Sequence, residues 1–143
     1  MKLCILGGGL TGLSLAKSLV KKGLSIDIFL NKKKSDFNRS RTIGISNDNL
    51  MYFNKEILDI KKLFWDIKKI EIYSDNLRNE KILNFENDNK TVFAIIRNYQ
   101  LQSKLLKSLK KDKLCKFKQN FDYNLSNLKK YKLIINCEND NYF

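Results

Sequence analysis

The alternation of apolar and polar positions divides the chain into short segments, and the first thirty residues follow the clearest pattern. Met1–Leu6 is an apolar run that is too short for a helix and suits a buried parallel strand. From Leu13 onward leucines recur at roughly helical spacing, and Gly23 follows two lysines as a suitable helix end. A second apolar run covers Ser25–Leu30. The pattern therefore predicts a strand, a helix and a second strand.

A glycine-rich motif joins the first strand to the helix and satisfies G-x-G-x-x-G. Its first glycine permits the tight turn, its second lets a pyrophosphate approach the backbone, and its third lets the helix pack closely on the strand. The phosphates of a dinucleotide then bind the free N–H groups and the positive dipole end of the helix. The alternative is a glycine-rich turn without a ligand. Because the motif follows a strand and opens a helix, we predict a dinucleotide site formed by Gly7, Gly8, Gly9, Leu10, Thr11 and Gly12.

The acidic residue that usually ends the second strand and binds the adenosine ribose is missing. Its position falls on Leu30, and Asn31 follows it. The side-chain carbonyl of Asn31 is a candidate for part of that role. Lys32–Lys34 keep NADP open as an alternative through contact with its 2′-phosphate, although a solvated turn is the simpler interpretation. The motif thus predicts a dinucleotide without specifying which one.

The rest of the chain alternates short strands with two helices. One helix is predicted over Asp48–Asp59, with Asn47 or Asp48 as its N-cap, and the other from Tyr99 or Gln100 to about Lys111. Further strands are predicted over Lys69–Asp75, Lys81–Phe85, Thr91–Ile96, Leu114–Phe117 and Lys132–Asn136. The polar segment 32–40 is a loop, and the pattern of segment 63–67, which holds the only tryptophan, defines no element. The order of elements indicates an α/β chain without internal repeats.

The histidine and cysteine content of the chain limits the functions that it can have. The 143 residues include no histidine, which excludes Ser-His-Asp and Cys-His nucleophile systems, H-E-x-x-H zinc sites and an imidazole acid or base. Cys4, Cys115 and Cys137 are far apart and show no C-x-x-C spacing, so neither a disulfide framework nor a metal site is predicted. Any chemistry must come from a cofactor or from residues outside this sequence.

The formal net charge of +13 and the pI of about 9.7 raise the question of acidic partners. The lysines are spread along the chain together with many Asn and Ile residues, which is typical of a protein encoded by an A+T-rich genome. A nucleic-acid-binding protein would instead concentrate its basic residues in a localised stripe. We therefore predict no specific nucleic-acid partner, and a basic binding module stays an alternative. No apolar run is long enough for a membrane span and no signal-peptide pattern is present, so we predict a cytoplasmic protein with weak peripheral attraction to the inner face of the membrane.

Taken in order, the motifs resemble FAD-dependent aromatic-ring hydroxylases of the p-hydroxybenzoate hydroxylase type. The glycine motif is followed by Arg-x-x-Gly-Ile-Ser at Arg41–Ser46, and Trp65 precedes a strand with alternating isoleucines at Ile70–Asp75. An apolar strand then ends in a polar residue, Asn98, three positions before Leu101. The resemblance spans nearly the whole chain and is closest to the branch that hydroxylates ubiquinone precursors.

This resemblance implies an α/β fold with a Rossmann-like βαβ FAD-binding unit and strands of a partial substrate domain. It implies FAD as cofactor, NAD(P)H as co-substrate and a small aromatic or quinone-precursor substrate that is hydroxylated with O₂. It places Arg41 along the FAD phosphates and ribose, and Asn98 on the flavin side; considered alone, these residues are a surface cation and a helix cap. No residue of this chain is assigned a catalytic role, because the flavin carries the oxidation.

The same resemblance divides the chain into residues 1–46 (the βαβ unit and the arginine motif), 63–96 (the partial substrate sheet) and 97–143 (the return to the FAD-binding fold). Segment 133–140 stands where the family continues into Gly-Ala-Asp-Gly, and Glu138 stands where the family prefers Asp. Full-length members are more than twice as long. The sequence therefore predicts a truncated N-terminal portion of a hydroxylase, inactive alone and of unspecified oligomeric state; a degenerate remnant is the alternative.

Overall fold

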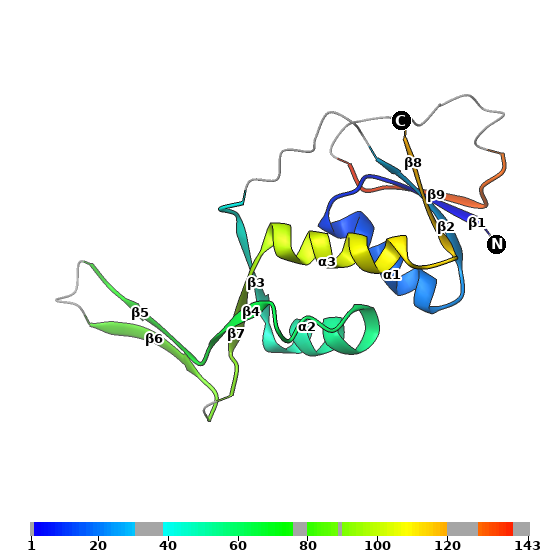
Figure 1. Ribbon diagram of the computed structural model, residues 1–143. Coiled ribbons are helices and arrows are strands. Elements are labelled where there is room, and N and C mark those ends of the chain that lie inside the picture. The colour runs from blue at the N-terminus through cyan, green and yellow to red at the C-terminus, as the bar shows by residue number, and fades with distance from the viewer. Residues whose placement is uncertain (1, 31–38, 76–79, 89, 120–128, 139–143) are drawn as a thin grey trace.

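A four-stranded parallel sheet forms the centre of the protein. The computed structural model describes residues 2–30, 39–75, 80–88, 90–119 and 129–138. The sheet has the strand order β8-β2-β1-β9, and all of its pairs are parallel. Its strands are β1 (Lys2–Leu6), β2 (Ser25–Leu30), β8 (Cys115–Gln119) and β9 (Leu133–Asn136) (Figure 1). Parallel strands buried on both faces read as continuous apolar runs, which is the pattern of β1 and β2.

Two helices that pack against each other cover one face of this sheet (Figure 1). They are α1 (Leu10–Lys21) and α3 (Asn98–Lys110). The apolar face of each helix packs against the strand side chains that point toward the helices, because successive side chains of a strand alternate between the two faces of the sheet. The buried residues of this core include Leu3, Ile5, Ile26, Ile28, Leu13, Ala16, Val20, Leu101, Leu105 and Leu109.

The opposite face of the sheet buries a smaller group: Cys4, Leu6, Phe29 and Tyr131. A fully buried carboxylate, Asp27, lies on this face as well. Its Oδ2 accepts a hydrogen bond from the Tyr131 hydroxyl at 2.7 Å and contacts the amino groups of Lys2 at 3.0 Å and Lys118 at 2.9 Å. Burial opposes ionisation of Asp27, but these three donors outweigh it and hold the pKa of the carboxyl below its ordinary value.

A second, antiparallel sheet has the order β3-β7-β4. It consists of β3 (Thr42–Ser46), β7 (Phe93–Arg97) and β4 (Phe64–Ile67). Gly44 of β3 lies against the ring of Phe93, which occupies the space that a Cβ would fill. A short helix, α2 (Asn47–Tyr52), and a π-helical turn, η1 (Phe53–Ile57), follow β3 and contribute Leu50 and Ile57 to the main core.

The third sheet is a two-stranded hairpin of β5 (Lys69–Tyr73) and β6 (Lys81–Glu86), which projects away from the rest of the molecule (Figure 1). Its register pairs Ile70 with Phe85 and Ile72 with Leu83, so these four side chains share one face. The opposite face carries ion pairs of Glu71 with Lys69 and Lys81, which together lower the pKa of that carboxyl to about 2. The hairpin is therefore amphipathic, with an exposed apolar face.

The mixed α/β class and the initial strand–helix–strand unit are confirmed. The predicted helix over 48–59 is wrong in its length, because regular α-helix ends at Tyr52 and gives way to the π-helical turn. Its predicted N-cap is also wrong: the Ser46 hydroxyl accepts the capping hydrogen bond from the Asn49 N–H. Neither β3 (Thr42–Ser46) nor β4 (Phe64–Ile67) was predicted as a strand. The domain division stays a prediction, and most of the loop predicted over 32–40 lies outside the described residues.

Candidate cofactor-binding site

The glycine loop turns sharply out of β1 and into α1. Gly7 has φ +111°, a conformation that favours glycine, and its N–H donates to the Phe29 carbonyl at 3.0 Å. A Cβ on Gly12 would overlap the Gly7 carbonyl oxygen and lie 3.4 Å from Ile5. Gly12 is thus the close-contact glycine that the motif predicts, and it lies inside α1, which begins at Leu10.

Gly9, the middle glycine of the motif, is in a different situation. It is the N-cap of α1 and has an ordinary extended conformation (φ −72°, ψ 176°), and apart from its chain neighbours no atom of the described residues lies within 4 Å of the position that a Cβ would take. The first α-helical hydrogen bond runs from the Leu13 N–H to the Gly9 carbonyl at 3.0 Å. The N–H groups of Leu10, Thr11 and Gly12 precede it and have no intrahelical acceptor. Within the described part of the chain, open space therefore adjoins the positive end of α1.

The carboxyl end of β2 differs from that of an ordinary dinucleotide site. Leu30 ends the strand, and its Cδ2 occupies the space that a Cβ on Gly8 would fill. The side chain at the usual ribose-binding position is thus apolar and packs on the glycine loop. The other predicted contributors at this edge, Asn31 and Lys32–Lys34, lie outside the described residues.

The helix α3 connects the glycine loop to the arginine motif. The Gln102 side-chain amide donates from Nε2 to the Gly8 carbonyl at 2.8 Å. One turn earlier on the same helix, the Asn98 N–H donates to the Arg41 carbonyl at 3.0 Å. Residues four apart on a helix lie about 6 Å apart along its axis. The structure therefore brings Asn98 and the Arg41 backbone beside the loop, and it adds Gln102, which the sequence analysis missed.

Asn98 does not act as a helix cap. It is the first residue of α3, whose N-cap is Arg97, and no side-chain capping bond is formed there. Among the described residues its Oδ1 is buried without a hydrogen-bond partner. A buried acceptor without a donor is unfavourable by about 1–3 kcal/mol, which makes this atom a candidate for binding a donor group of a ligand.

The two arginines near this point have different surroundings. The Arg41 side chain is exposed. The guanidinium of Arg97 lies over the ring of Trp65, 5.1 Å from its centroid, in cation–π geometry. Arg97 is thereby held against the second sheet, whereas Arg41 is exposed where it leads into β3.

The end of β9 approaches the loop from its other side. The Cys137 N–H donates to the Leu6 carbonyl at 2.8 Å, which extends the parallel ladder by one residue. A Cβ on Gly7 would lie 2.8 Å from Cγ of Glu138 and 3.2 Å from the Cys137 carbonyl. Burial raises the pKa of the Cys137 thiol. Glu138 thus lies beside the first glycine of the motif, at the edge where the carboxyl ends of β1 and β9 meet.

These features fit an FAD molecule at its pyrophosphate. The open space at Gly9 among the described residues and the first-turn N–H groups of α1, which have no intrahelical acceptor, suit an anion, and the buried Oδ1 of Asn98 suits a donor group nearby. Leu30 does not suit the adenosine ribose, since it offers no hydrogen-bond acceptor.

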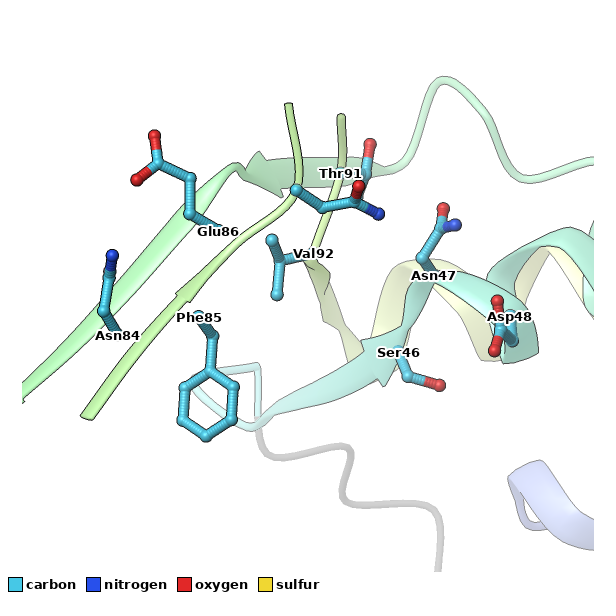
Figure 2. Close-up of a pocket in the computed structure, with 9 residues that line it drawn as sticks. Ser46, Asn47, Asp48, Asn84, Phe85, Glu86, Thr91 and Val92 are labelled. Carbon is cyan, nitrogen blue, oxygen red and sulfur yellow. The ribbon is translucent and has the colours of Figure 1, made fainter. Parts of the chain in front are cut away.

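A separate hollow of about 370 Å³ lies between the base of the hairpin and the start of α2. Figure 2 shows the Phe85, Val92 and Ser46 side chains around it. Ser46 ends β3, whereas the Arg41–Asn98 contact lies just before its other end, five residues and about 16 Å away at 3.3 Å per strand residue. The hollow is therefore not part of the glycine-loop site. No helix in the described part of the chain is long and apolar enough to cross a membrane.

The glycine turn, the parallel sheet with order β8-β2-β1-β9 and the antiparallel second sheet together form the fold of FAD-binding monooxygenases. No protein-family model and no curated protein matches this chain. It is similar to the solved structure of the p-nitrophenol 4-monooxygenase PnpA from Pseudomonas putida DLL-E4, with a TM-score of 0.66 and 16% identity over 82% of this chain and 31% of that chain.

Two further solved structures show the same relationship. PqsL from Pseudomonas aeruginosa, in complex with 2-aminobenzoylacetate, has a TM-score of 0.65 and 15% identity over 83% of this chain and 33% of that chain. HpxO from Klebsiella pneumoniae, complexed with FAD and uric acid, has a TM-score of 0.59 and 19% identity over 82% of this chain and 30% of that chain. The chain spans about a third of the length of these proteins. At such identities the similarity establishes the fold.

Proposed function

We propose that this chain is the FAD-binding part of a flavin-dependent monooxygenase that hydroxylates an aromatic ring. The observation that carries the proposal is the open space at Gly9, within the described residues, next to the N–H groups that begin α1 and have no intrahelical acceptor. The loop would bind the pyrophosphate, with Leu10, Thr11 and Gly12 supplying backbone donors. Arg41 would contact the phosphates and ribose, and Asn98 the flavin side, as the resemblance implies. Asn31 stays a proposed ribose contact.

The proposal also covers the substrate, the reductant and the activity of the chain alone. The substrate would be a small aromatic compound, a ubiquinone precursor by the branch of the resemblance, and NAD(P)H would reduce the flavin. The bound flavin supplies the oxidation of the ring with O₂. The residues of this chain bind and orient the cofactor, and we propose that the chain alone is inactive.

The charge of +13 supports weak peripheral binding to an anionic membrane surface.

FAD binding tests the proposal directly. The purified chain is incubated with FAD and desalted, and its absorption spectrum is recorded. Protein-bound oxidised flavin absorbs near about 370 and 450 nm through its own chemistry, so retained bands at these wavelengths are the expected result. A titration with NADP⁺ serves as the comparison. Saturable binding of NADP⁺ with no retention of FAD would favour a nicotinamide oxidoreductase and contradict the proposal.

The basic-module alternative has its own signature. Binding to nucleic acid or anionic lipid that falls steeply with salt, without retention of FAD, would support it. The measurement is a pair of binding curves at low and high ionic strength. The proposal predicts FAD binding at both, because the hydrogen bonds to the pyrophosphate are formed by backbone groups rather than by surface lysines.

A further inference from the structure

The hydrogen bond from Gln102 to the glycine loop joins residues that are 94 positions apart in the sequence. The neighbouring residues Leu101 and Leu105 are buried, at 2% and 0% exposure, and fix α3 on the central sheet. The amide of Gln102 is therefore presented to Gly8 by a rigid helix. The bond length of 2.8 Å and its partly buried position are those of a well-formed hydrogen bond.

This bond acts on the peptide group between Gly8 and Gly9. The peptide is planar and trans, so its C=O and N–H point in opposite directions. Fixing the Gly8 carbonyl toward α3 therefore directs the Gly9 N–H away from α3. Glycine peptides have the largest conformational freedom of any residue, so without an external bond this peptide has several orientations available.

We propose that Gln102 is a positioning residue, which holds the Gly8–Gly9 peptide in the orientation in which the loop receives the pyrophosphate of the cofactor. Gln102 acts through the loop backbone and itself makes no contact with the ligand. This inference rests on the proposed FAD function for its ligand, but the effect of Gln102 on the loop is a property of the chain without ligand.

The test uses Gln102→Glu, which keeps the size of the side chain but removes its N–H donors. At pH 7.5 the carboxylate faces the Gly8 carbonyl oxygen, and we expect FAD affinity to fall about tenfold or more, because one hydrogen bond is lost and two acceptors oppose each other. Near pH 4.5, close to the reference Glu pKa of about 4.3, a large fraction of the carboxyl groups is protonated and regains a donor, and the Gly8 carbonyl oxygen opposite favours this protonated form. The ratio of variant to wild-type affinity should therefore recover toward one.

Gln100→Glu is the matched control. It introduces the same charge on α3 two positions away, which places it on the opposite side of the helix at about 100° per residue. We expect wild-type affinity for this variant. Equal losses in the two variants would show that added negative charge alone weakens binding, which would overturn the proposal.

A second measurement works without FAD. Hydrogen exchange of the loop amides in residues 7–13 should be faster in Gln102→Glu than in the wild type at pH 7.5, and unchanged in Gln100→Glu, with equal unfolding midpoints for all three proteins. Unchanged loop exchange in Gln102→Glu would overturn the role of Gln102 whatever the cofactor. Faster loop exchange in a chain whose wild type binds no FAD would support the role of Gln102 while contradicting the proposed function.

Discussion

Gly8, Gly9 and Gly12 of the loop are constrained to different degrees by the atoms that surround them. Gly12 lies where the backbone of α1 meets the Gly7 carbonyl oxygen, so the neighbour of an added Cβ would be rigid backbone. Gly8 lies against the flexible end of Leu30, which is able to shift. Gly9 borders open space. Packing thus constrains Gly12 strongly and Gly8 only weakly, and no contact within the described residues constrains Gly9.

Gly12→Ala should destabilise the fold. The added methyl group would overlap the Gly7 carbonyl oxygen, and such overpacking costs about 1–3 kcal/mol in the free energy of unfolding. Urea unfolding measures the change. Gly8→Ala is the matched comparison, because its new methyl group meets only the end of the Leu30 side chain, and it should lose less. An equal or larger loss for Gly8→Ala would contradict the packing described for Gly12.

Asp27 gives the protein a specific response to acid. Its pKa is below the ordinary value of about 3.9, so its contribution to stability is present above that pH and is lost as the pH falls through the folded-state pKa. Lys2 and Lys118 are partly exposed, which reduces the strength of their ion pairs with this carboxylate. The Tyr131 hydroxyl, hydrogen-bonded in a buried position, is the firmer partner.

Asp27→Asn should therefore be less stable than the wild type at pH 7, by about 1–3 kcal/mol for a weakened buried hydrogen-bond network. The difference between the two proteins should shrink as the pH is lowered from about 5 to 3, because the wild type then loses the contribution that the variant never had. Urea unfolding at each pH provides the data. A difference that stays constant with pH would show that the charge of Asp27 does not contribute.

At the scale of elements, the end of α1 is defined by its sequence. Gly23 has φ +80°, its N–H donates to the Val20 carbonyl at 2.9 Å, and the Leu24 N–H donates to the Leu19 carbonyl at 3.2 Å. This pair of bonds is the Schellman arrangement that ends many helices at a glycine.

Gly23→Ala should lower the free energy of unfolding by about 1 kcal/mol, because alanine is strained at positive φ, while within the described residues only the chain neighbours come within 4 Å of the new methyl group. FAD affinity should stay at the wild-type value, since Gly23 lies at the far end of α1 from the loop. Loss of affinity together with stability would indicate that α1 responds as one unit, contrary to this account.

The elements that the sequence predicted well are those that are determined locally. The glycine motif at residues 7–12 and Gly23 mark the two ends of the first helix, and the apolar runs on either side predict the two flanking strands. The β4 strand was missed because its pattern is short and half exposed, and its place depends on pairing with β7. The contacts of Gln102 with Gly8 and of Tyr131 with Asp27 join residues 94 and 104 positions apart, and no local pattern encodes them.

At the scale of the whole molecule, the hairpin is the part that packs least against other elements. Leu83 and Phe85 are each 48% exposed on the apolar face, and a hairpin of two strands is only marginally stable unless it packs against something else. The chain also spans about a third of the length of the solved structures that it matches. An uncovered apolar face of this kind promotes association.

Phe85→Thr should reduce concentration-dependent association of the chain without changing its unfolding midpoint, since threonine keeps a strand preference while removing apolar surface. Sedimentation velocity over a series of concentrations measures this. Asn84→Thr changes the neighbouring residue on the opposite face and should leave association unchanged. A wild-type chain that stays monomeric over the whole series would contradict the expectation.

The central claim is that the loop at Gly9 binds the pyrophosphate of FAD, and the most direct test is the FAD dissociation constant of Gly9→Val compared with that of the wild type. A Cβ at Gly9 meets no atom of the described residues beyond its chain neighbours, and the extended backbone there suits any residue, so the variant should fold, with at most about 1 kcal/mol lost at the helix cap. The valine side chain would occupy the space assigned to the pyrophosphate. We predict affinity at least about tenfold weaker, equivalent to about 1.4 kcal/mol. Wild-type affinity in a folded Gly9→Val chain would contradict the account.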